Sequence, residues 1–238
     1  EKDLNSLFKK KYSAVFHFAA LKAASESMEY PEKYSKINLI GTINVLNEML
    51  RNKVNNFVFS SSAAVYGVPQ YLPVDEGHPL QPINYYGFTK LEIERFLQWY
   101  SDLKGLNYAT LRYFNAAGAD PDNEIGEAHS PETHLIPLAI NVALGIKERL
   151  DIYGVDYPTD DGTAIRDYIH VKDAAKATAD VMKSTYKNKH IIITGRSKIK
   201  LTNFLKTLAA ILEIKKKIRF KNKKIIGHYV LSPYTFVP

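Results

Sequence analysis

Short apolar runs alternate with longer amphipathic stretches through the first half of the chain. A continuous apolar run of about four to eight residues is typical of a buried strand, whereas apolar residues that recur every three or four positions are typical of a helix. These patterns predict strands at residues 14–18, 56–60 and 108–114 and helices at residues 31–54 and 85–100. Because such alternation is typical of parallel sheets, we expect an α/β fold with helices on both faces of the sheet.

The second half of the chain is more broken. A loop rich in proline, glycine and acidic residues covers residues 121–131. The elements expected after it are helices at 134–145 and 171–186, a strand at 190–194 and a helix at 202–212 that begins at the cap residue Thr202. We expect the segment after Gly118 to build a smaller lobe over the carboxyl edge of the sheet, where ligands bind in open α/β folds.

Composition excludes several classes of protein. Apolar residues make up 45% of the 238 residues, which is enough to fill a core. No uncharged apolar run reaches about eighteen residues, so we expect no membrane span. The chain has no cysteine, which excludes disulfides and fits a reducing compartment such as the cytoplasm. The seven histidines are scattered without the spacing of metal ligands, and we predict no metal site.

The net charge of +7 is unevenly distributed. From residue 187 onward, 13 Lys and Arg residues accompany a single acid, Glu213, whereas the rest of the chain holds 19 basic and 24 acidic residues. Such a tail can meet phosphates or nucleic acid, but it lacks the interleaved aromatic residues that stack on bases. A solvated lysine-rich surface is favoured. Nucleic-acid binding, with a steep salt dependence, is kept as an alternative.

Tyr86 and Lys90 stand four residues apart near the start of a predicted helix, so their side chains share one face. A free phenol, with a pKa near ~10, is a poor base at neutral pH, and an adjacent ammonium lowers that pKa. The pair can thus supply a base, although most pairs of this spacing are ordinary exposed residues. Ser60, Ser61 and Ser62 follow a predicted strand, where a hydroxyl either bonds a reacting alcohol or ketone or merely caps a turn.

Five segments carry a resemblance to a known family. They are residues 17–23 (HFAALKA), 60–67 (SSSAAVYG), 86–90 (YGFTK), 111–119 (LRYFNAAGA) and 161–171 (DGTAIRDYIHV). In order and spacing they resemble the UDP-glucose 4-epimerases of the extended short-chain dehydrogenase class. The resemblance runs from about residue 12 to residue 186.

The resemblance implies a Rossmann-like, doubly wound parallel sheet that binds NAD. It implies an NAD-binding domain at residues 1–118, to which residues 168–186 return, and a substrate-binding lobe at residues 119–238. The implied reaction is the interconversion of UDP-glucose and UDP-galactose, in which C4 of the sugar is oxidised to a transient ketone and then reduced on its opposite face. NAD is retained, with no net redox change.

Roles for single residues follow from the same resemblance. Tyr86 would take the proton of the 4-hydroxyl, Lys90 would hold Tyr86 and the cofactor ribose, and Ser62 would bond the reacting oxygen. The implied cofactor contacts are Phe18, Ala19, Ala20, Lys22, Asn38, Ser60, Tyr86, Lys90 and Phe114. The implied substrate contacts are Ser62, Tyr86, Asn115, His134, Leu135, Asp151, Ile152, Tyr153 and Arg166. The guanidinium of Arg166 also suits phosphate oxygens on physical grounds.

The chain departs from the family pattern at both ends. No Gly-x-Gly-x-x-Gly occurs, and the first glycine, Gly41, lies inside a predicted helix. The charged start at Glu1, without Met or a hydrophobic stretch, is typical of a cut end, so we expect the first βαβ unit to lie upstream. After Gly195, the family's diphosphate-clamping arginine and Gly-Asp pair are replaced by Arg196-Ser197, and Arg219 or a tail lysine is an alternative clamp.

Other functions stay open at this point. Another nucleotide-sugar 4-epimerase, with or without N-acetylated substrates, is an alternative. A 4,6-dehydratase or decarboxylase would need an acid and a base beside Ser62, where Ala63 and Ala64 stand. A non-catalytic sensor of NAD or nucleotide sugar is favoured by the missing glycine-rich loop and opposed by the intact Tyr86 and Lys90. The resemblance suggests a homodimer through the helices predicted at 31–54 and 85–100.

Overall fold

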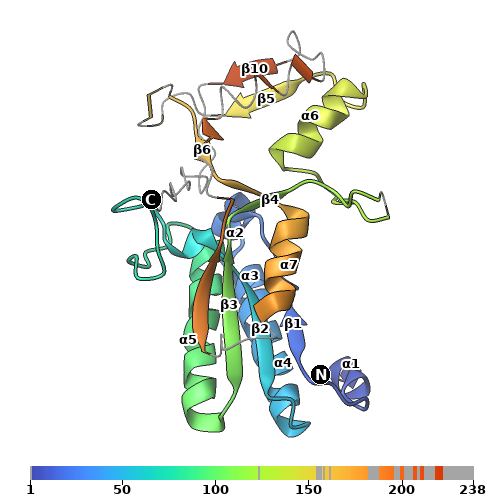
Figure 1. Cartoon of the computed structure of the whole chain (residues 1–238), viewed down its shortest axis with the longest axis vertical. Helices are drawn as coiled ribbons and strands as arrows, with labels where there is room; N and C mark the ends of the chain where they lie inside the picture. Colours follow the sequence, from blue (N-terminus) through green and yellow to red (C-terminus); the bar gives the residue numbers. More distant parts are fainter. Residues whose placement is uncertain are drawn as a thin grey trace.

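The structure is a computed structural model in which a parallel sheet forms the centre (Figure 1). It describes residues 2–122, 124–153, 157, 159–160, 162–181, 188–195, 199–200, 206–207, 210–211 and 218–221. The sheet has the order β1-β2-β3-β8, formed by β1 (Val15–His17), β2 (Asn56–Ser62), β3 (Asn107–Tyr113) and β8 (Lys189–Ile193). All three neighbouring pairs are parallel.

Helices cover both faces of this sheet. They are α1 (Lys2–Leu7), α2 (Ala24–Glu29), α3 (Pro31–Tyr34), η1 (Ser35–Ile40), α4 (Gly41–Arg51), η2 (Ala63–Val65), α5 (Tyr85–Lys104) and α7 (Val171–Val181). Because side chains alternate along a strand, Phe57 and Phe59 of β2 pack with α4 and α5, whereas Val58 packs with α7. The predicted doubly wound α/β fold is confirmed.

The helix predicted at 31–54 is a continuous helical path of three pieces. Its middle piece, η1, is a π-helix, and the residues that flank it, Tyr34 and Gly41, keep right-handed helical backbone angles. The path ends at Arg51, because Asn52 leaves the helical conformation. Apolar periodicity predicts the path but does not distinguish α-helical from π-helical hydrogen bonding.

The later segments form smaller units that lie above the sheet in Figure 1. They are the pairs β4 (Asn115–Ala117) with β7 (Tyr168–His170), β6 (Ile165–Arg166) with β9 (Ile199–Lys200) and β5 (Leu150–Tyr153) with β10 (Ile218–Lys221), together with α6 (Leu135–Ala143). Helix α6 and β5 share a core of Ala139, Val142, Leu150 and Ile152.

Strand β8 corrects one expectation. Residues 190–194 fall within the predicted lobe at 119–238, but β8 pairs with β3 in the main sheet, through positions such as Leu111 and Ile191. Its apolar run suits a parallel strand covered by α7. The predicted cap Thr202 lies outside the described residues, and no helix among those residues is long and apolar enough to cross a membrane.

Candidate active site

Helix α5 begins immediately before the predicted catalytic pair. Asn84 caps it, because its Oδ1 accepts a hydrogen bond from the N–H of Gly87 at 2.8 Å. A Cβ on Gly87 would lie 2.6 Å from the carbonyl oxygen of Ala64, so glycine allows the first turn to pack closely on the segment after β2. This approach brings Tyr86 and Lys90 to the carboxyl end of the strand.

The end of β2 meets both members of the pair. Lys90 Nζ donates to the carbonyl oxygen of Ser60 at 2.7 Å, and the Ser62 hydroxyl lies close enough to the phenol of Tyr86 to lower its pKa. The Ser62 oxygen also accepts from the N–H of Ala64 at 3.2 Å, which caps η2. The geometry is compatible with both roles considered for this serine, which are capping of a turn and contact with the reacting group.

Burial controls the electrostatics of the pair. Desolvation raises the pKa of Tyr86, and the hydrogen bond with Ser62 opposes that rise. Desolvation also lowers the pKa of Lys90 to about 7, although the Glu94 carboxylate acts in the opposite direction. The expectation that Lys90 lowers the phenol pKa is therefore wrong for the protein alone, because both groups lose hydration when they are buried together.

The predicted cofactor contacts after β1 are Phe18, Ala19, Ala20 and Lys22. Asn38, which is fully buried in η1, anchors the loop that contains these residues. The Asn38 amide oxygen accepts from the N–H of Leu21 at 2.8 Å, and its nitrogen donates to the Leu21 carbonyl at 3.0 Å and to Thr89 Oγ1 at 3.1 Å. Asn38 therefore ties the loop to α5, and its direct cofactor contact stays a prediction.

Two predicted residues follow β3. Phe114 is 8% exposed and packs in an apolar cluster that contains Ala63 and Leu91. Asn115 begins β4, where its side-chain nitrogen donates to the carbonyl oxygen of Asp167 at 2.7 Å. Both residues lie at the carboxyl edge of the sheet, and their contacts with cofactor and substrate stay predictions.

One contact joins the loop after β1 to the later segments. Lys22 Nζ lies 3.4 Å from Nε2 of His134, the residue before α6. Leu135, the first residue of α6, packs against the core that α6 shares with β5. The structure thus brings one predicted cofactor contact and one predicted substrate contact together.

The remaining substrate contacts lie on β5 and β6. Asp151 Oδ1 is 3.5 Å from Nε of Arg149. The Ile152 side chain is 3% exposed and belongs to the core, so its backbone is the part left to meet a ligand. Tyr153 ends β5, and its side chain lies outside the described residues. Burial lowers the pKa of Arg166, whose Nη1 donates to the carbonyl of Ile165.

His134 belongs to a cluster of four possible metal ligands that the sequence analysis missed. Ligand-type atoms of Glu127, His129, Glu132 and His134 lie within 4.8 Å of one another. Donors of these types suit a transition-metal ion. Hydrogen bonds already engage three of the four: His134 Nδ1 lies 2.9 Å from Glu127 Oε1, and Glu132 Oε1 accepts from the N–H groups of Thr133 and His134. The absence of a metal site stays a prediction.

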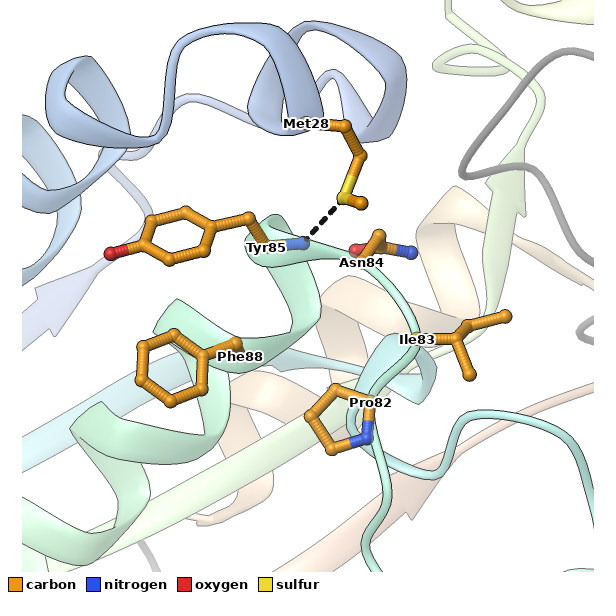
Figure 2. A pocket seen from close by; sticks show the side chains of 6 residues that line it. All are labelled: Met28, Pro82, Ile83, Asn84, Tyr85 and Phe88. Carbon is orange, nitrogen blue, oxygen red and sulfur yellow. Dashed lines mark hydrogen bonds between the residues drawn. The ribbon is translucent and has the colours of Figure 1, made fainter.

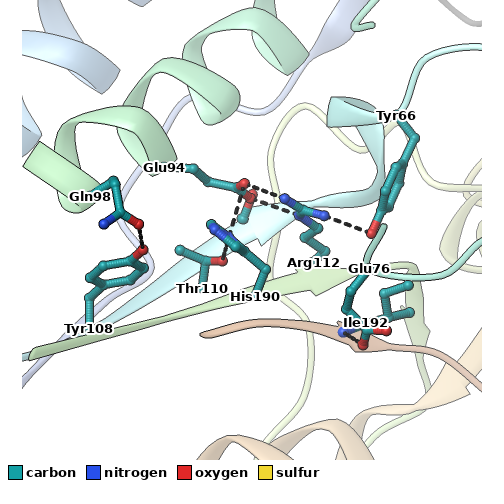
Figure 3. Close-up of polar contacts among 10 residues, drawn as sticks. Tyr66, Glu76, Glu94, Gln98, Tyr108, Thr110, Arg112, His190 and Ile192 are labelled. Atoms are coloured by element: carbon teal, nitrogen blue, oxygen red, sulfur yellow. Dashed lines mark hydrogen bonds and ion pairs between the residues drawn. The ribbon is translucent and has the colours of Figure 1, made fainter. Parts of the chain in front are cut away.

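Two further residues shape the site. Ser27, fully buried in α2, accepts a hydrogen bond from the N–H of Tyr86 at 2.9 Å. Glu94, four residues after Lys90, is buried with Arg112 (Figure 3). The helical stripe that contains Tyr86 and Lys90 could have indicated Glu94 from the sequence, whereas Ser27 has no such signal.

A shallow depression lies beside this site and does not include it (Figure 2). It is lined by Met28, Pro82, Ile83, Asn84, Tyr85 and Phe88. Tyr85 and Phe88 occupy the outer side of α5, whereas Tyr86 and Lys90 contact β2. The depression therefore lies between α2, the segment before α5 and the first turn of α5.

Comparisons with known proteins identify the family of the chain. The model of the NAD dependent epimerase/dehydratase family matches residues 1–194. The UDP-glucose 4-epimerase of Halalkalibacterium halodurans is 53% identical over 163 residues, which are 68% of this chain and 49% of that protein. The chain spans about half the length of the curated relatives it matches.

Solved structures show the same likeness. The UDP-glucose 4-epimerase of Brucella ovis in complex with NAD has a TM-score of 0.84 and 39% identity, covering 94% of this chain and 70% of that one. The enzyme of Bifidobacterium longum in complex with NAD+ and UDP has a TM-score of 0.88 and 32% identity, with coverage of 95% and 69%. On the family match and these likenesses, the chain belongs to the NAD dependent epimerase/dehydratase family.

Proposed function

We propose that this chain carries the catalytic centre of a UDP-glucose 4-epimerase, which interconverts UDP-glucose and UDP-galactose with NAD as a retained cofactor. One observation carries the proposal: the Tyr86 phenol and the Ser62 hydroxyl lie close enough at the carboxyl edge of the sheet for Ser62 to lower the phenol pKa, and Lys90 is held one helical turn away by the Ser60 carbonyl. A phenol and a hydroxyl at one point are the groups needed to move a proton on and off a sugar hydroxyl.

The substrate class is supported by the relatives. The protein of Halalkalibacterium halodurans is named a UDP-glucose 4-epimerase, and the Bifidobacterium longum structure contains NAD+ and UDP. Arg166 adds a physical argument, because its guanidinium is desolvated and the described part of the chain places no carboxylate against it. We assign the diphosphate to Arg166, with Asn115, His134, Leu135, Asp151, Ile152 and Tyr153 as further contacts to the nucleotide sugar.

The residues present fit the nicotinamide-ribose half of NAD. Lys90 is 2% exposed, and one of its three N–H donors goes to the Ser60 carbonyl, which leaves donors for ribose hydroxyls. Phe18, 57% exposed, lies at the same edge of the sheet. Lys90, Tyr86 and Phe18 would hold this half, with Ala19, Ala20, Lys22, Asn38, Ser60 and Phe114 around it. When bound, NAD+ would accept the hydride of C4 and return it.

The chain's own residues handle the proton. Tyr86 would accept the proton of the sugar 4-hydroxyl and give it back after the ketone has turned over in the site. Ser62 would bond the same oxygen, since its hydroxyl already meets the phenol. Burial raises the pKa of the phenol, so a positive charge placed beside it would make it a better base.

The proposal is tested with UDP-galactose and the Tyr86→Phe variant. The intact protein is expected to form UDP-glucose, and Tyr86→Phe to lose about 10²–10⁴-fold in kcat because the base is gone. Tyr85→Phe is the matched control, since Tyr85 bonds Ser35 Oγ at 2.6 Å on the outer side of the helix. Near-normal turnover by Tyr86→Phe would refute the assignment, and a 4-keto-6-deoxy product would identify a dehydratase instead.

A homodimer is the second part of the proposal. Ile37 and Ile40 of η1 are 45% and 53% exposed, and Phe88 and Trp99 of α5 are 38% and 63% exposed. Residues 88 and 99 share one helical face, because eleven residues make about three turns. Exposed apolar side chains on two neighbouring helices favour a second copy as their partner.

Domain limits and location stay predictions as well. We divide the chain into an NAD-binding domain at residues 1–118, to which residues 168–186 return, and a substrate lobe, with β8 now assigned to the former. A cytoplasmic location and the lack of nucleic-acid binding by the basic tail are likewise expectations.

A further inference from the structure

Three residues of α5 contact three consecutive residues of β2. Tyr86, Lys90 and Glu94 follow one another at intervals of four, so they form one stripe along the helix. Tyr86 meets the Ser62 hydroxyl, and Lys90 donates to the Ser60 carbonyl at 2.7 Å. Between these two contacts, the Ser61 hydroxyl donates to Glu94 Oε1 at 2.6 Å.

The contact with Glu94 follows from the pleat of the strand. Phe57 and Phe59 point toward the face that α5 covers, and Ser61 continues this alternation. Ser61 is 3% exposed, so its hydroxyl requires a partner inside the protein. The middle serine thus anchors the strand end to the helix, and the two residues that flank it meet the catalytic pair.

Glu94 is itself fixed by strong partners (Figure 3). Arg112 of β3 donates from Nη2 to Glu94 Oε2 at 2.7 Å and from Nε to Oε1 at 3.1 Å, and His190 Nδ1 of β8 lies 3.2 Å from Oε2. Burial alone would raise the pKa of Glu94, but the hydrogen bonds from His190, Arg112 and Ser61 lower it to about 2. The carboxylate therefore stays charged and bonded on both oxygens.

The Arg112 guanidinium extends the network. It is 1% exposed, and its Nη1 donates to the phenol oxygen of Tyr66 at 2.9 Å. A buried ion pair seldom adds stability over apolar residues of the same volume, because desolvation offsets the attraction. A gain in stability therefore does not explain why Glu94 and Arg112 are buried in this core. Positioning of the end of β2 does explain it.

We propose that Glu94 is a positioning residue of the active site: held by Arg112, it fixes Ser61 and thereby the distances from Ser60 to Lys90 and from Ser62 to Tyr86. This inference rests on the proposed epimerase function. A small displacement of Ser62 would misalign the phenol with the sugar hydroxyl, and rates are sensitive to such shifts.

The test removes one hydrogen bond and leaves the ion pair in place. Ser61→Ala deletes the hydroxyl, and Ser61→Thr retains it. Tyr108→Phe is the matched control, because the Tyr108 hydroxyl donates to Gln98 of the same helix at 2.7 Å, also between α5 and the sheet (Figure 3). Kinetics with UDP-galactose should give about a tenfold lower kcat for Ser61→Ala, with KM within about twofold of the parent, and recovery in Ser61→Thr. Tyr108→Phe should keep the parent kcat.

A second readout does not depend on turnover. With tyrosine labelled by ¹³C at Cζ, the Tyr86 resonance is identified by its loss in Tyr86→Phe. This resonance should shift in Ser61→Ala and stay in place in Tyr108→Phe. A Tyr86 signal unchanged in Ser61→Ala, or a kcat loss equal in Ser61→Ala and Tyr108→Phe, overturns the positioning role. If the parent protein leaves UDP-galactose unconverted while the signal shifts, the epimerase function fails and the positioning role stands.

Discussion

At the scale of single residues, loss of hydration is the main cause of the pKa shifts in the site. Lys90 is 2% exposed, and burial drives its pKa down while the pKa of Tyr86 goes up. Both shifts favour the uncharged forms of the two side chains. We infer that the base is switched on by cofactor charge, which couples proton removal to the presence of a hydride acceptor.

The buried lysine predicts a pH-dependent stability. Its pKa is about 7 in the folded protein and 10.5 for a free lysine side chain, so between these limits the unfolded chain binds more protons, and folding becomes more favourable as pH rises. Lys90→Met lacks this dependence. Between pH 7 and pH 9, urea unfolding should show the parent gaining about 2 kcal/mol relative to Lys90→Met.

Lys36→Met is the control for that measurement, because Lys36 is exposed on η1. It should reproduce the parent's rise in unfolding free energy. If the unfolding free energies of the parent and of Lys90→Met change with pH in parallel, Lys90 is not desolvated as it is in the structure.

Residue-level prediction from the sequence succeeded in part. The spacing of Tyr86 and Lys90 on one helix face and the place of Ser62 after a strand could be predicted, because helical spacing and strand-end position are local properties. The direction of the Tyr86 pKa could not be predicted, since desolvation depends on everything packed around the phenol. Helical spacing places Glu94 on the stripe of Tyr86 and Lys90, but its ion pair with Arg112 is a tertiary contact that the sequence does not show.

At the scale of elements, the start of α5 is the critical junction. Gly87→Ala would place a Cβ against the Ala64 carbonyl, where backbone cannot yield easily. We expect a loss of about 1–3 kcal/mol in unfolding free energy together with a lower kcat, because the first turn of α5 must move away from β2. Chemical denaturation and turnover of UDP-galactose measure the two effects.

Gly41→Ala is the matched substitution, since a Cβ at Gly41 meets no atom within 4 Å. Gly41 lies at the start of α4. The substitution should raise the free energy of unfolding by about 0.5–1 kcal/mol without altering turnover. Equal effects of the two glycine variants would contradict the close packing of α5 on the Ala64 segment.

Elements were predictable where periodicity alone defines them. The runs that became β2 and β3 and the stripe that became α5 were located within a few residues. The π-helical turn in η1 was not, because apolar periodicity does not distinguish π-helical from α-helical hydrogen bonding. It is also the turn that carries Asn38, whose amide holds the loop after β1.

At the scale of the whole molecule, the exposed apolar side chains of η1 and α5 have no role in the fold or the site of the single chain. If a second copy covers it, Phe88→Glu should convert a dimer to a monomer, because a carboxylate would be buried against apolar residues. Light scattering after size exclusion gives the mass directly. Glu29→Gln on the exposed end of α2 is the control, and a monomeric parent protein would end the dimer proposal.

The most direct test of the central claim follows the hydrogen on C4 of the sugar. UDP-galactose that carries deuterium at C4 is incubated with the protein and NAD+, and the products are analysed by NMR and mass spectrometry. Tyr86 and Ser62 acting on the hydroxyl predict UDP-glucose that retains the deuterium at C4, because it leaves as hydride and returns to the same carbon. Failure to form UDP-glucose, or product whose C4 has exchanged with solvent, would contradict the account.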